Sequence, residues 1–141
     1  MLRFTILALV FLSATLAGGF WITAHSPGSP LGKQTPDAAV LIEVGGCADP
    51  GKAALAGTAE GLIDGRRKSI PLTFTRTSKP GVFAVKKQWN GTGPWVLAIT
   101  GTYLGHPSSL VVEVGTKGDY RSKAVDPKEL SARVEAALKA S

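Results

Sequence analysis

Cysteine, methionine and histidine are scarce in this sequence. Its 141 residues include one Cys, one Met and two His. A single Cys excludes a disulfide framework within the chain and any zinc or iron–sulfur site built from several cysteines. The only Met is Met1, which excludes Met-rich copper chemistry, and two His leave little room for a His-based metal site. We therefore expect no cofactor, and the length allows one compact domain rather than two.

Motifs of the common catalytic classes are also missing. The sequence has no G-x-S-x-G elbow, no Walker lysine motif and no D-x-D-x-D-G calcium loop. Most of its ten carboxylates fall in turns and caps, where Asp and Glu have structural roles. A glycosidase would need two carboxylates held across a cleft, which a domain of this size rarely builds alone. We assign no catalytic residue and no metal ligand, and predict that the chain is not an enzyme.

Positive charge is in moderate excess. Sixteen Lys and Arg against ten Asp and Glu give a formal net charge of +6. The basic residues are scattered and form no aromatic-rich motif, so nucleic acid is disfavoured as a partner. A positive balance of this size is typical of a solvated surface, with contact to anionic lipid headgroups or acidic polymers as the alternative.

The N-terminus has the pattern of an export signal. A start with one positive charge, Met1-Leu2-Arg3, precedes the uncharged run from Phe4 to Ile22. Small residues suit cleavage after Ala17 or after Ala24. The 19-residue run is also just long enough to span a bilayer as an uncleaved anchor. We therefore expect a signal peptide or membrane anchor helix over residues 1–24 and a periplasmic or extracellular protein, which contacts the membrane only if the leader is retained.

A Pro-, Gly- and Ser-rich stretch over residues 25–37 predicts a linker between leader and domain. Residues 38–124 then show short alternating runs separated by Gly and Pro turns, which predict an all-β antiparallel sandwich of about seven strands. Asp64-Gly65 predicts a hairpin turn, because type I′ turns need positive φ at both central residues. Pro71 lacks an N–H donor and predicts an edge strand or a bulge. The predicted strands cover residues 38–44, 54–63, 69–75, 82–89, 95–103, 110–114 and 120–123.

The C-terminus predicts a helix instead. Asp126-Pro127 is a strong helix start, with Asp as N-cap and Pro in the first turn. Leu130, Val134 and Leu138 then recur every four residues on one face. We expect an amphipathic helix over residues 126–140 that packs on the sandwich.

Four residues are candidates for binding or chemistry. Trp89 and Trp95 bracket a turn and could form a platform for sugars, although indoles at strand ends more often fill the core. Cys47 and His106 form the only thiol–imidazole pair that the domain offers, because His25 lies at the leader boundary and is expected to be flexible or removed. A buried or loop thiol and a turn histidine are the more ordinary interpretation of that pair.

The motifs of residues 40–115 suggest a family. A Gly57-Thr-Ala-Glu-Gly61 strand, a following hairpin, a Pro80-Gly-Val-Phe turn and a Gly93-Pro-Trp95-Val-Leu strand succeed one another. This order resembles exported bacterial Ig-like or transthyretin-like β-domains, including the carboxypeptidase-regulatory type. The resemblance implies the fold and no activity. The leader, the strand spacing and the lack of a reactive constellation favour a non-catalytic accessory or protein-interaction module at the bacterial cell envelope. The alternatives are small-ligand or glycan binding through Trp89 and Trp95, and metal or thiol chemistry through Cys47 and His106.

Overall fold

A computed structural model describes residues 19–32, 35, 37–90 and 93–141. Within these residues the chain forms nine strands, three short 3₁₀ helices and one α-helix. The strands are β1 (Trp21–His25), β2 (Ala38–Gly45), β3 (Ala54–Ile63), β4 (Arg66–Pro71), β5 (Phe74–Arg76), β6 (Val82–Lys86), β7 (Trp95–Tyr103), β8 (His106–Val114) and β9 (Tyr120–Val125). The helices are η1 (Pro30–Gly32), η2 (Pro50–Lys52), η3 (Pro127–Glu129) and α1 (Leu130–Ala140).

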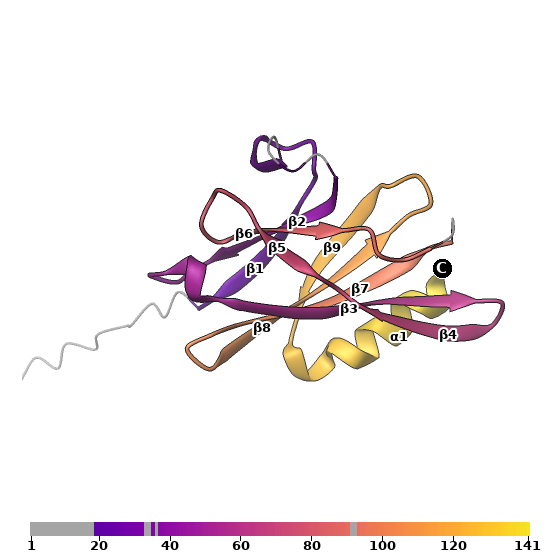
Figure 1. The fold of residues 1–141 in the computed structure, drawn as a ribbon. Helices are drawn as coiled ribbons and strands as arrows, with labels where there is room; N and C mark the ends of the chain where they lie inside the picture. Colours follow the sequence, from indigo (N-terminus) through magenta and orange to yellow (C-terminus); the bar gives the residue numbers. More distant parts are fainter. Residues whose placement is uncertain (1–18, 33–34, 36, 91–92) are drawn as a thin grey trace, which may run out of the picture.

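Two antiparallel sheets pack face to face (Figure 1). One sheet has the order β1-β2-β6-β5 and the other has the order β4-β3-β7-β8-β9. Alternate side chains of both sheets point between them and form the main core. The first sheet contributes Val40, Ile42 and Val85, and the second contributes Leu97 and Val112, all at 0–1% exposure.

Helix α1 covers the outer face of the second sheet (Figure 1). Val134 and Leu138 are buried against Val96 and Val111, as the four-residue spacing predicted. Asp126 is an N-cap as predicted, but of the 3₁₀ helix η3 that precedes α1: its carboxylate accepts a hydrogen bond from the Lys128 backbone N–H at 2.8 Å. The α-helix itself begins at Leu130. No helix in the described part of the chain is long and apolar enough to cross a membrane.

Most of the predicted strands are found, but β6 ends at Lys86 instead of Trp89 and β8 begins at His106 instead of Leu110. The largest correction is at Pro71. The segment predicted as a single strand over residues 69–75 is two strands, which lie in different sheets. Pro71 ends β4, which is an edge strand as predicted. The chain then crosses to the first sheet: the Leu72 N–H bonds the Gly57 carbonyl at 2.9 Å, and the Thr73 N–H bonds the Gln88 side chain. The count of seven strands rises to nine through this division and through β1.

The N-terminal strand β1 was not predicted. The expected leader helix lies outside the described residues up to residue 18, but Trp21–His25 form a strand of the first sheet. It pairs with β2 along its whole length and buries Ile22 and Ala24 at 3% and 8% exposure. The two sheets therefore begin before residue 25, and the expected linker is the connection from β1 to β2. The expectation that His25 is flexible is wrong, because His25 ends β1 opposite Leu41.

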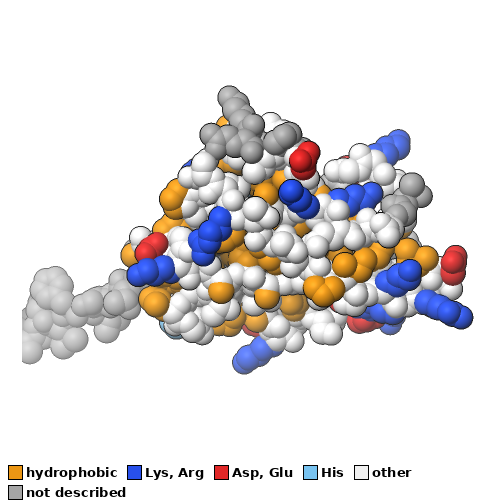
Figure 2. Space-filling view, viewed as in Figure 1, with side chains coloured by type: hydrophobic (Ala, Val, Ile, Leu, Met, Phe, Trp, Pro, Cys, Tyr) orange, Lys and Arg blue, Asp and Glu red, His pale blue; other side chains and the backbone are white. Residues whose placement is uncertain are grey.

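On the side of the molecule where β3 and β5 lie foremost in Figure 1, the strands do not completely cover the hydrophobic side chains between the sheets. Figure 2 shows hydrophobic side chains between the strands there, with Lys and Arg mainly around the margins. Partly buried residues that pack against the main core come from these strands and their neighbour β4, and they include Leu55, Ile63, Ile70 and Phe74. The short edge strand β5 and its exposed Arg76 limit pairing with other chains on this side.

Candidate functional site

The two candidate indoles lie together in the core. Trp89 and Trp95 are 4% and 2% exposed, and their ring centroids are 6.5 Å apart at an angle of 37°. Gly61 on β3 makes room for Trp95, because a Cβ there would lie 2.7–2.9 Å from the indole ring. The rings thus fill the end of the space between the sheets, and neither presents a free face on which a sugar could stack.

A cavity of about 390 Å³ lies beside Trp89. Its wall includes Asp37 and Ala38 at the start of β2, Lys87 after β6, and Gly115 after β8. Trp95 does not line it. The volume is within the range of small-molecule sites, roughly 300–1,000 Å³. A ligand hypothesis at Trp89 therefore depends on this cavity rather than on stacking between two indoles.

The candidate thiol–imidazole pair is not joined in the described structure. No hydrogen bond links Cys47 to His106, which is exposed at the start of β8. Burial and then the nearby Asp49 carboxylate raise the pKa of the Cys47 thiol, which opposes its ionisation. No group of three or more His, Cys, Asp and Glu among the described residues could hold a metal ion. The arrangement does not activate the thiol.

Sequence reasoning missed a small polar cluster on the outer face of the first sheet. His25 lies 4.0 Å from the Glu43 carboxylate, and Lys79 approaches the same carboxylate to 3.9 Å. The Nε2 atom of His25 is buried and has no hydrogen-bond partner. Cross-strand pairing of β1 with β2 brings His25 and Glu43 together, and the assignment of these residues to a leader concealed that pairing.

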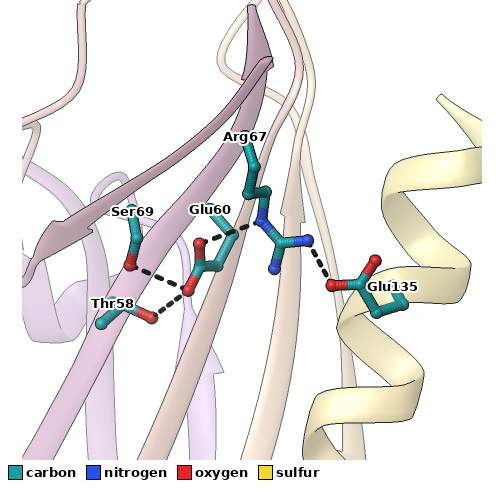
Figure 3. Close-up of polar contacts among 5 residues, drawn as sticks. All are labelled: Thr58, Glu60, Arg67, Ser69 and Glu135. Atoms are coloured by element: carbon teal, nitrogen blue, oxygen red, sulfur yellow. Dashed lines mark hydrogen bonds and ion pairs between the residues drawn. The ribbon is translucent and has the colours of Figure 1, made fainter. Parts of the chain in front are cut away.

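A second polar cluster fastens α1 to the sheet below it (Figure 3). The Glu60 carboxylate accepts hydrogen bonds from Thr58 at 2.9 Å, Ser69 at 3.0 Å and Arg67 at 3.2 Å. Arg67 also pairs with Glu135 on the helix, and these hydrogen bonds and charges raise its pKa. All the side chains of this cluster are committed to one another, so it holds the fold together rather than presenting a reactive group.

Among the residues that the structure describes, the tip of the β7–β8 hairpin presents the most exposed large hydrophobic side chain. Leu104 is 79% exposed and has a φ of +48°, followed by Gly105 at +78°. The β3–β4 hairpin has the same kind of turn, with Asp64 at +52° and Gly65 at +73°, as its Asp-Gly sequence predicted. Asp tolerates a left-handed backbone, whereas Leu pays roughly 1–2 kcal/mol for it. Leu104 is thus disfavoured by both its backbone and its contact with solvent.

Comparison of the chain with protein-family models, with curated proteins and with solved structures finds no match.

Proposed function

We propose that the chain is an exported, non-catalytic Ig-like β-sandwich module that binds a protein partner at the bacterial cell envelope through the tip of the β7–β8 hairpin. The observation that carries this proposal is Leu104. A Leu side chain that is 79% exposed in a left-handed backbone conformation stabilises neither the turn nor the packing of the domain. Burial against a partner would account for its presence.

The position of the hairpin supports an envelope role. Tyr103 precedes Leu104 and stacks on Phe20, with ring centroids 6.0 Å apart. Phe20 directly precedes β1 and lies within the expected leader segment, three residues after the cleavage position at Ala17. The hairpin tip and the start of the domain therefore lie at the same end of the molecule (Figure 1). A partner in or near the membrane would meet this end first if the leader is retained.

If the chain is exported, the position of β1 limits where a signal peptidase can cleave the leader. Cleavage after Ala24 would remove four of the five residues of β1, among them the buried Ile22. Cleavage after Ala17 would leave the strand intact. We therefore expect exported material to begin at Gly18, or at Met1 if the leader is an anchor. N-terminal sequencing that found His25 as the first residue would contradict a functional role for β1.

A photo-crosslinking amino acid placed at position 104 in the native envelope tests the proposed function. We expect a covalent adduct with a specific protein from position 104 and none from position 62. Position 62 is the control, because Leu62 is also exposed (52%) but lies next to the turn of the β3–β4 hairpin. Leu104→Asn should weaken recovery of the same protein by tagged chain, whereas Leu62→Asn should not. Identical adducts from the two positions, or none from either, would refute the proposal.

A further inference from the structure

The outer face of the second sheet has an open groove that α1 leaves uncovered. The groove has a volume of about 390 Å³ and runs between the helix and strands β8 and β9. Its floor and one wall are apolar, with Val111 on β8, Val125 on β9 and Ala137 on α1. Val111 is 6% exposed, and Val125 and Ala137 are partly exposed, so an apolar surface is accessible beneath the rim.

Three cations surround this apolar surface. Arg121 and Lys123 project from β9, and Arg133 projects from the facing side of the helix. Arg133 has an exposed ion pair with Glu129 at 3.4 Å, whereas neither Arg121 nor Lys123 has an ion pair within the described structure. One carboxylate, Glu113, also lines the groove and lies opposite Arg121 in the β8–β9 register. The rim therefore has two more positive than negative charges.

The alternation along β9 explains why these residues gather here. Tyr120 packs toward the main core, so Arg121, Lys123 and Val125 share the opposite face, on the same side of the sheet as α1. The two β9 cations are separated by about 7 Å, which is the distance between alternate residues of a strand. They can approach the same end of a ligand from one side while Arg133 approaches it from the helix.

We propose that this groove is a binding site for an organic anion with an apolar body, of the fatty-acid type. The acidic head would lie between Arg121, Lys123 and Arg133, and the hydrocarbon would cover Val111, Val125 and Ala137. Charge-assisted contacts between the head and the three cations, and removal of apolar surface from water, both contribute to the affinity, and the head contacts also orient the ligand. Nothing in this proposal depends on the hairpin tip or on a protein partner.

The chain offers a matched control at the other edge of the same sheet. Arg66 and Lys68 on β4 have the same spacing as Arg121 and Lys123, are also exposed, and line none of the cavities described here. Replacing either pair by Gln removes the same amount of charge from the molecule. A difference between the two double variants therefore reports the groove and not the overall positive charge.

The test is a titration of the full chain with decanoate, below the concentration at which decanoate forms micelles. We expect a saturable single site, with amide shifts in NMR spectra confined to β8, β9 and α1. The Arg121→Gln/Lys123→Gln variant should bind about tenfold more weakly, since two exposed charge contacts together contribute about 1.4 kcal/mol. The Arg66→Gln/Lys68→Gln variant should differ from the parent by less than twofold.

Two further ligands distinguish the chemistry. Decanol and decyltrimethylammonium have the same hydrocarbon with a neutral and a positive head, and we expect neither to saturate the groove. Vesicles containing phosphatidylglycerol, added to the decanoate complex, show whether a headgroup in a bilayer competes for the groove or only a free anion does. The proposal is overturned if both double variants weaken binding equally, if decanol binds as tightly as decanoate, or if the shifts spread over the surface without saturation.

Discussion

The assignment of β1 to the folded domain makes a quantitative prediction about Ile22. This side chain is 3% exposed and packs across the core, because a Cβ added to Gly101 of the opposite sheet would lie 2.8 Å from its Cγ2 atom. Replacing it by Ala removes buried methyl and methylene groups and leaves a cavity. Ile→Ala changes at such sites cost roughly 2–5 kcal/mol.

Urea unfolding followed by tryptophan fluorescence measures this cost. With an m-value of about 2 kcal/mol/M, typical of small domains, Ile22→Ala should lower the urea midpoint by about 1–2.5 M. Thr23→Ala is the matched control, since Thr23 is the next residue of the same strand and points to the opposite face. It should shift the midpoint by much less, about 0.5 kcal/mol or below in free energy. Coincident curves for Ile22→Ala and the parent chain would refute the place of β1 in the core.

The polar cluster, the indole packing and the thiol give further predictions. Glu60→Ala should cost about 1–3 kcal/mol of unfolding free energy, because the Glu60 carboxylate is only 13% exposed and the groups that donate hydrogen bonds to it lose their partner. Glu135→Ala removes only an exposed ion pair with Arg67 and should cost at most about 1 kcal/mol. Gly61→Ala should destabilise the fold by about 1–3 kcal/mol through overlap with the indole below it, and unchanged thermal melting would contradict this. Because its pKa is raised, the Cys47 thiol should be less ionised than an ordinary thiol at any given pH, so its alkylation rate should rise only at higher pH.

Local patterns predicted much of the fold. The strands over residues 54–63 and 95–103 have the predicted bounds, since alternation and flanking turn residues mark them clearly. The Asp64-Gly65 turn and the Asp126 cap are also confirmed, because each depends on the backbone preference of one or two residues. The strand β1 escaped prediction because its first residues, Trp21 and Ile22, end the long uncharged run that begins at Phe4. Within such a run a half-buried strand has no polar alternation to reveal it.

The candidate surfaces were harder to reach from the sequence, and the reason differs for each. Trp89 and Trp95 are candidates by residue type alone. Whether an indole stacks on a ligand or packs in the core depends on the neighbouring strand, and here Gly61 on β3 leaves the space that Trp95 fills. The turn at Leu104 lacks the Asn or Asp that marks a type I′ hairpin, so sequence rules place the turn later. The cations of the groove come from β9 and α1, whose proximity follows only from the packing of the helix on the sheet.

These contrasts separate residues that stabilise the domain from residues that the fold does not need. Asp64 and Leu104 occupy equivalent turn positions, and only Asp64 suits the turn chemically. If Leu104 had no role beyond the turn, Leu104→Asn would change nothing except to relieve about 1 kcal/mol of backbone strain. The proposed function requires the same gain in stability together with loss of the partner. Unfolding and recovery of the partner by tagged chain, both measured on Leu104→Asn, therefore decide between a tolerated flaw in a hairpin and a contact retained at the expense of stability.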